Sequence, residues 1–228
     1  SLERANVDAG VIQFASSAGK AVLYVLLIIN IAVSLGVKES SVAALLGTAG
    51  VTVGLALQGG LANLAGGVLL LLFKPFVVGD YIIQDQSNGC EGTVAKIEIC
   101  YTTLLSIDNK KIVVPNGTLS NSTIINVTAK ENRKLEIKVG ISYEADIQKA
   151  KRIIDKILRE DADTKSDTKE MVVFVDELAD SAVIMGLRVW VSTERYWPTK
   201  WRLNQKIKEE FDANGIVIPY NQMEVYVC

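Results

Sequence analysis

The chain has 228 residues, and its 24 basic and 26 acidic side chains leave a formal net charge of −2. It contains no histidine, which excludes Ser/His/Asp and Cys/His catalysis, histidine zinc sites and histidine pH switches. No basic excess is present for a nucleic-acid backbone, so no nucleic-acid partner is expected. Only seven of the charged residues precede position 76, which predicts a membrane-embedded first third and a soluble remainder.

The first predicted element is a membrane helix, which with its short loop occupies residues 1–40. Residues 21–37 carry no charge, and the apolar stretch extends back past Lys20 to position 11, enough to cross a bilayer. Lys20 either reaches an anionic headgroup or simply lies near the helix end. Residues 1–10 are too polar for a signal peptide and do not begin with methionine, so we expect an earlier segment to be missing from this sequence.

The second apolar stretch is uncharged over the 34 residues 40–73. It is too long for one straight span and too short for two spans with an ordinary loop. Seven glycines lie between positions 47 and 67. We therefore predict a transmembrane helix over 41–58, a break near Gly59 and Gly60, and an interfacial helix over 59–77. The short loop around 38–39 predicts that the two membrane spans are antiparallel neighbours.

Helical periodicity sorts residues 41–58 onto faces, because successive positions are rotated by about 100°. Two stripes of small residues result, one of Gly47, Gly50 and Gly54 and the other of Ala44, Thr48 and Thr52. Between the stripes lies a narrow apolar ridge of Val51 and Leu55, with Gln58 close by, whereas Leu57 lies on the opposite side. Small residues let helix backbones approach closely in lipid, so this helix suits packing against an identical helix on each side.

Head-to-tail packing of such helices closes into a ring whose axis the ridge faces. Val51 and Leu55 would then form two stacked apolar collars, and a narrow apolar pore blocks ions by dewetting. The alternative that the stripes leave open is a helix dimer through Gly50 and Gly54, with no pore.

Residues 78–128 are predicted to form a small β domain. Short β-rich runs at 81–83, 92–97, 102–107 and 111–114 are separated by turn segments at 85–89 and 108–109. We expect a barrel-like scaffold rather than a ligand site. The segment 115–117 (PNG) resembles a turn before a short helix, and Asn126 leads out of the domain.

The three cysteines, Cys90, Cys100 and Cys228, are odd in number and lack metal-ligand spacing such as CxxC. We interpret them as reduced structural thiols of a cytosolic domain, with a redox role as the alternative.

Residues 129–222 are predicted to form an α+β domain. Alternating apolar residues over 135–141 predict a half-buried strand, and the spacing over 146–160 predicts an amphipathic helix. Strands at 171–178 and 182–191 follow, and Pro198 is expected to open a second helix that ends before Gly215. The connecting carboxylates Asp161, Asp163, Asp167 and Glu170 are interpreted as a solvated loop, with a metal site as the alternative. No catalytic, cofactor-binding or metal-ligating residue is assigned.

The run 47–80 (GTAGVTVGLALQGGLANLAGGVLLLLFKPFVVGD) resembles the pore-lining helix and cytoplasmic elbow of the mechanosensitive channel of small conductance (MscS) family. The similarity continues through GTV at 92–94, TT at 102–103, DNK at 108–110, VPNG at 114–117 and IIN at 124–126, and then through FDANGI at 211–216, IPY at 218–220 and QM at 222–223.

The resemblance implies a membrane α-helical pore region, a cytoplasmic β domain (Sm-like, barrel-like) and an α+β (ferredoxin-like) domain. It implies a homoheptamer in which each subunit contributes one pore helix above a hollow cytoplasmic vestibule. Residues 223–228 of each subunit would supply one strand of an inter-subunit barrel at the base of the vestibule. The expected location is the inner (plasma) membrane, with multiple passes and the C-terminal domain in the cytoplasm. The first of the family's three membrane helices has no counterpart in this sequence.

By position, the family's two seal residues fall on Val51 and Leu55, its helix break on Gln58 and Gly59, and a second hinge on Gly67. The upper seal position, commonly leucine, is valine here. A shorter side chain implies a slightly wider or less firmly closed collar.

We therefore expect a tension-opened channel, not an enzyme, that releases ions and small osmolytes during hypoosmotic shock and needs no cofactor. Its partners would be copies of itself and membrane lipids, with force entering through the 21–37 helix and the 61–73 segment. The alternatives are a membrane-anchored scaffold or enzyme, and a ligand-gated relative that uses the same pore.

Overall fold

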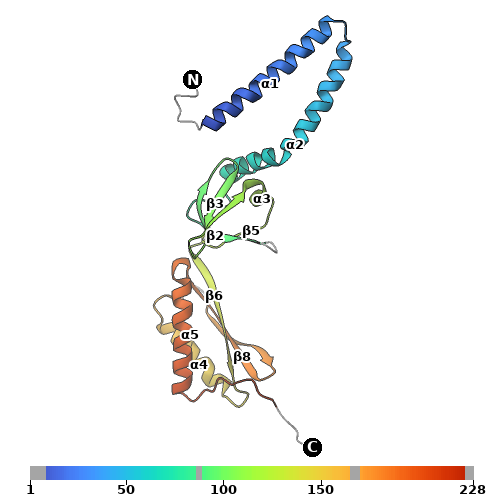
Figure 1. Ribbon diagram of the computed structural model, residues 1–228. Helices are drawn as coiled ribbons and strands as arrows, with labels where there is room; N and C mark the ends of the chain where they lie inside the picture. The colour runs from blue at the N-terminus through green and yellow to red at the C-terminus, as the bar shows by residue number, and fades with distance from the viewer. Residues whose placement is uncertain (1–8, 86–88, 165–169, 224–228) are drawn as a thin grey trace, which may run out of the picture.

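The computed structural model describes residues 9–85, 89–164 and 170–223, which form three parts in chain order (Figure 1). Two long helices at one end are followed by a β domain and then by an α+β domain at the other end. Helix α1 spans Ala9–Ser34 and helix α2 spans Glu39–Phe73. They run in opposite directions and diverge from the loop that joins them, where Gly36 takes a φ of +94°.

Helix α2 is one continuous helix, whereas two helices were expected on either side of Gly59 and Gly60. Figure 1 shows it changing direction partway along, so that its last part lies across the top of the β domain. Glycine, unlike proline, keeps its backbone N–H, so the hydrogen-bond ladder can continue through such a bend. The helix ends at Phe73, because the next residue, Lys74, takes the left-handed conformation (φ 46°). The Lys74 N–H makes the last hydrogen bond of the helix, to the Leu70 carbonyl.

The β domain is a five-stranded antiparallel sheet in the order β4-β3-β2-β1-β5. The strands are β1 (Tyr81–Gln84), β2 (Glu91–Ile97), β3 (Tyr101–Leu105), β4 (Lys111–Pro115) and β5 (Ile124–Asn126), and helix α3 (Asn116–Ser120) connects the last two. The four predicted strands, the short helix after Pro115 and the turn at Asn109 (φ 62°) are confirmed. A bulge between Val94 and Lys96 breaks the register of β2 against β3, which favours a strongly bent sheet.

The core of the β domain includes residues from the end of the membrane region. Leu70 of α2 and Phe76, which follows the helix, are 2% and 1% exposed. They pack with Ile82, Val94 and Leu104 from the strands. The exit of the long helix is therefore built into the β domain.

Two cysteines of the described residues, Cys90 and Cys100, are free thiols in partly buried positions. Burial raises the pKa of the Cys90 thiol, which keeps it protonated near neutral pH. Cys228 lies outside the described residues.

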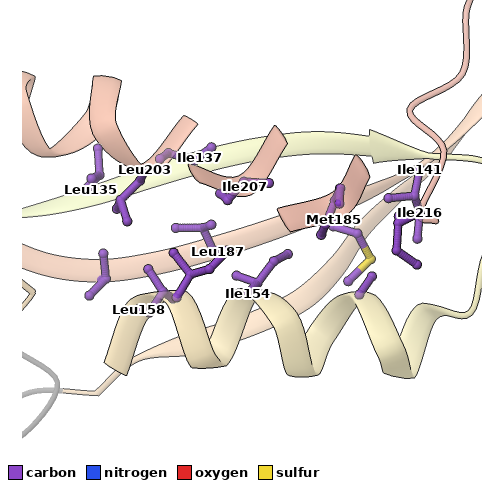
Figure 2. Packing of buried hydrophobic residues seen from close by; sticks show 14 of the residues in the cluster. Leu135, Ile137, Ile141, Ile154, Leu158, Met185, Leu187, Leu203, Ile207 and Ile216 are labelled. Carbon is purple, nitrogen blue, oxygen red and sulfur yellow. The ribbon is translucent and has the colours of Figure 1, made fainter. Parts of the chain in front are cut away.

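The α+β domain has a three-stranded antiparallel sheet in the order β6-β8-β7. Its elements are β6 (Asn132–Ile141), α4 (Ile147–Glu160), β7 (Val172–Ala179), β8 (Ala182–Ser192), the short 3-10 turn η2 (Thr193–Arg195) and α5 (Tyr196–Ala213). This order of elements and strands is ferredoxin-like, and the described residues supply three of that fold's four strands. Figure 2 shows Leu187 of the sheet meeting Ile154 and Leu158 of α4 and Leu203 of α5 in one core.

Helix α5 begins at Tyr196, two residues before the expected start at Pro198. A proline is tolerated there because N–H groups of the first helical turn have no partner within the helix. The strand expected at 223–228 lies outside the described residues except for Met223, which is not in a strand.

The interpretation of the acidic connection as a solvated loop is wrong for Asp161 and Asp163. The Asp161 side chain is 4% exposed and accepts two hydrogen bonds from Arg202 of α5, at 2.8 and 2.9 Å. Arg202 also bonds Asp163 at 2.8 Å, and Arg195 approaches Asp163 to 3.3 Å. These ion pairs tie the end of α4 to α5. Glu170 is exposed, and Asp167 lies outside the described residues.

Candidate pore helix

Both long helices are apolar and long enough to cross a membrane, over residues 10–34 and 39–73. The side chains of α1 are largely exposed, and α2 buries only Gly66, Gly67 and Leu70 within the chain. Apolar surface of this extent needs lipid or protein around it. The rest of α2 is therefore available to neighbouring subunits, lipid or a pore.

Val51 and Leu55 lie one turn apart on α2 and are 64% and 66% exposed. Beside them, a Cβ placed at Gly47, Gly50 or Gly54 would meet no atom within 4 Å. Among the described residues the glycine stripe is therefore open, and its shallow surface can accept another helix backbone.

The threonines of the second stripe satisfy their hydroxyl groups within α2 itself. Thr48 donates to the Ala44 carbonyl at 3.0 Å, and Thr52 donates to the Thr48 carbonyl at 2.9 Å. With the hydroxyl hydrogen bonded to the preceding turn, the stripe presents no unsatisfied donor to its surroundings. This stripe too is suited to helix packing in an apolar medium.

The residues expected at hinges fall into two different environments. Gln58, Gly59 and Gly60 are exposed, and a Cβ at either glycine would meet no atom within 4 Å. Gly67 is instead buried against the β domain, where a Cβ would lie 2.2 Å from the Ile99 carbonyl oxygen and 2.6 Å from Asn116 Nδ2. In this structure Gly67 is a close-contact position, because only glycine lets the helix approach so near.

Gly66 makes the same kind of contact on the neighbouring side of α2, since its Cβ would lie 2.7 Å from the Asn116 carbonyl group. Nearby, Asn63 Oδ1 accepts a hydrogen bond from the Gly117 N–H at 3.0 Å. Together these contacts dock the last part of α2 on α3. We call the residues Asn63, Gly66, Gly67, Asn116 and Gly117 the anchor.

The Asn116 side chain holds the loop beneath α2 in place. It is fully buried, and its Nδ2 donates to the carbonyls of Glu98 and Ile99 at 2.8 and 3.0 Å. Its Oδ1 accepts from Thr102 at 2.8 Å. A buried amide satisfied on both sides fixes the β2–β3 loop, whose Ile99 carbonyl faces Gly67.

The docking contacts of Asn63, Gly66, Asn116 and Gly117 were not predicted from the sequence. One signal was available, since Asn63 is a polar residue in an otherwise apolar run and Asn116-Gly117 follows a proline. The contact between them depends on the folded domain, so spacing alone did not reveal it.

Residues 60–129 match the family model described as the mechanosensitive ion channel beta-domain, and residues 135–218 match that described as mechanosensitive ion channel MscS, C-terminal. An uncharacterized MscS family protein of Synechocystis is 34% identical over 226 residues, which cover 99% of this chain and 75% of the relative. A small-conductance mechanosensitive channel of Edwardsiella ictaluri is 40% identical over 179 residues, covering 78% and 61% of the two chains.

Among solved structures, Helicobacter pylori MscS in its closed state superposes with a TM-score of 0.89 at 28% identity, covering 98% of this chain and 87% of that chain. Arabidopsis thaliana MSL1 shares the fold at 18% identity, with a TM-score of 0.80 over 96% of this chain and 80% of that one.

Proposed function

The chain belongs to the MscS family of mechanosensitive channels, and we propose that membrane tension opens its pore to release ions and small osmolytes during hypoosmotic shock. The observation that carries this proposal is the surface of α2. Two stripes of small residues flank the exposed ridge of Val51 and Leu55, on a helix that is uncharged from position 40 to 73.

A ring of subunits would bring these ridges together around one axis. Both small-residue stripes support head-to-tail packing of identical helices. The β domain supports it too, because β4 and β5 are the outer strands of its sheet and the described residues give each a partner on one side only. Exposed apolar residues on these strands include Val113 and Ile125. Seven copies, the number implied by family resemblance, would close the ring.

The ring would place Val51 and Leu55 as two apolar collars across the pore. Water leaves a narrow apolar constriction, and ions cannot then pass. No titratable side chain lies between positions 40 and 73, so this gate needs no proton transfer.

The anchor suggests how tension moves the gate. Asn63, Gly66 and Gly67 hold the last part of α2 on the β domain, whereas Gln58, Gly59 and Gly60 are exposed. Tension favours the state of larger in-plane area. We infer that the lipid-facing α1 transmits this force and that the upper part of α2 tilts about residues 58–60 while its anchored end stays in place.

The protein would lie in the inner (plasma) membrane with both domains after α2 in the cytoplasm. Lipids and permeating solutes would be its other partners. A ligand-gated relative remains the second candidate within the family, because the same pore geometry serves either stimulus.

Pressure-ramp patch recording of the purified protein in liposomes tests this function. Stepwise currents that begin above a threshold suction, without added ligand, are expected. Silence up to membrane rupture would contradict tension gating, and currents that need a solute rather than suction would favour the ligand-gated candidate. Native mass spectrometry in detergent tests the ring, since a monomer or dimer would contradict it.

A further inference from the structure

The β domain and the α+β domain have separate cores. The buried cluster around Phe76 and the cluster around Leu187 share no residue. A cleft of about 580 Å³ lies at the junction, lined by Gly79, residues 128–131 and residues 192–194. The chain passes from β5, which ends at Asn126, to β6, which begins at Asn132. Without a shared core, the relative position of the two domains depends on the polar contacts of this linker.

One end of the linker is bonded to the segment that follows α2. Asn126 Nδ2 donates to Asp80 Oδ2 at 2.8 Å and lies 3.3 Å from the Pro75 carbonyl oxygen. Asp80 Oδ2 also accepts from the Val77 N–H at 2.9 Å. The Asn126 amide therefore bonds to the elbow, the segment 74–80 between α2 and β1. Phe76 of this elbow is buried beside Leu70 of α2.

The same Asn126 side chain shapes the linker itself. Its Oδ1 accepts from the backbone N–H groups of Thr128 and Ala129, at 3.2 and 3.0 Å. Thr128 Oγ1 in turn accepts from the Tyr81 N–H at 2.9 Å and donates to Asp80 Oδ1 at 3.4 Å. Asn126 thus uses its donor on the pore side and its acceptor on the linker side.

The far end of the linker is bonded to the α+β domain. The Thr193 N–H donates to the Glu131 carbonyl at 2.8 Å, and the Thr193 hydroxyl donates to the Lys130 carbonyl. Thr193 opens the turn η2, directly before α5. The linker is therefore restrained at both ends, and few of its residues can absorb a movement of one domain against the other.

We propose that Asp80 and Asn126 form a joint that positions the α+β domain against the exit of the pore helix, so that a displacement of that domain is passed to α2. The part of this inference that concerns the pore rests on the function proposed above. Asn126 and Asp80 act here as positioning residues, because they touch the elbow and the linker and not the permeation path.

Reciprocal substitution tests the joint. Asn126→Asp keeps the acceptor for the two linker N–H groups but sets a carboxylate against Asp80 in place of the amide donor. Adding Asp80→Asn removes the repulsion between the two carboxylates and returns a donor–acceptor pair to this contact, but the new amide nitrogen takes the place of the oxygen that accepts from the Val77 N–H. Asn204→Asp makes the same chemical change at an exposed position of α5 and serves as the matched control. Asn126→Ser, which removes the amide without adding charge, replaces Asn126→Asp if that variant does not assemble.

The first readout is hydrogen exchange of the full chain in lipid nanodiscs, followed in the segment 74–81. Asn126→Asp should speed exchange there by roughly tenfold, since the acceptor of the Val77 N–H is pushed away. The double variant should return part of the protection, because the repulsion is removed while the Val77 N–H has lost its acceptor. Asn204→Asp should match the wild type. Equal exchange in the wild type and Asn126→Asp, or a double variant no better protected than Asn126→Asp, would overturn the joint.

The second readout is the midpoint tension in pressure ramps. Asn126→Asp should lower it, because the exit of α2 loses a restraint, and the double variant should restore it. If the channel gates and Asn126→Asp leaves the midpoint unchanged, the joint does not act on the pore and the proposal fails. If the exchange pattern holds while the wild type gives no tension-gated current, the proposed function fails and the joint between the domains stands.

Discussion

Asn63 of α2 accepts a hydrogen bond from the backbone N–H of Gly117 at 3.0 Å, across 54 positions of the chain. One turn further along α2, Gly66 and Gly67 bring the helix backbone against Asn116 and Ile99. The last part of α2 is therefore docked on the β domain and should move together with it. Movement of the exposed part of α2 must pivot above Asn63 or break this docking.

Asn63→Ala removes the acceptor of the Gly117 N–H. A neutral hydrogen bond contributes about 1 kcal/mol, so exchange of segment 115–120 should quicken roughly fivefold in nanodiscs. Asn30→Ala, at an exposed position of α1, is the control and should leave that segment unchanged. Unaltered protection in Asn63→Ala would show that the bond does not hold the docking.

Gly67→Ala forces a Cβ to within 2.2 Å of the Ile99 carbonyl oxygen. Since that carbonyl belongs to a loop held by Asn116, relief requires backbone movement, and overpacking of this kind costs about 1–3 kcal/mol. The detergent-solubilised protein should lose several degrees of Tm. Gly60→Ala is the control, because its added Cβ meets no atom of the described residues within 4 Å. Equal Tm values for the two variants would contradict the anchor.

Arg202→Leu leaves the buried carboxylate of Asp161 without its partner. An unpaired buried charge is strongly unfavourable, and because Arg202 is 40% exposed we expect a loss of about 2 kcal/mol in the stability of the α+β domain. Lys206→Leu removes a longer, more exposed pair with Glu160 on the same helix and should cost less than about 1 kcal/mol. Similar denaturant midpoints for both variants would count against a structural role for the Arg202 pair.

Acid pH should lower the stability of the α+β domain, where Asp163 pairs with Arg202 and Arg195. The hydrogen bond from Arg202, assisted by Arg195, holds the pKa of Asp163 below its ordinary value. A carboxyl group whose pKa is lower when folded stabilises the fold above the ordinary carboxyl pKa, about 3.9, and this contribution disappears as pH falls through the lowered pKa. Thermal unfolding of the α+β domain should therefore shift to lower temperature below about pH 4. Asp163→Asn should flatten this dependence, and an unchanged acid slope would contradict it.

Periodicity predicted the elements with strong internal patterns. The alternating residues of β6 and the amphipathic face of α4 fix their type without help from the rest of the fold, and Asp146 caps α4 by accepting from the Gln148 and Lys149 N–H groups. Strand β5 has only three residues, too few for an alternation, so its place beside β1 comes from the folded sheet.

Helix α2 shows the same division between what local spacing predicts and what only the fold reveals. The stripes and the ridge follow from helical spacing alone, and the structure places them on one helix as expected. The anchor, by contrast, depends on a contact between residues 63–67 and 116–117 that no local pattern encodes. The hinge expected at Gly67 came from the family resemblance, and the close packing of Gly67 against Ile99 becomes visible only with the β domain in place.

The most direct test of the account is a comparison of Leu55→Ser with Leu57→Ser in pressure-ramp recordings from liposomes. Both residues are exposed leucines of α2, at 66% and 63%, but only Leu55 lies on the proposed pore ridge. A hydroxyl at the collar admits water, so Leu55→Ser should open at lower tension or leak at rest, whereas Leu57→Ser should keep the wild-type closed state. Leu55→Ser currents indistinguishable from wild type, or an equal leak from Leu57→Ser, would contradict the apolar gate.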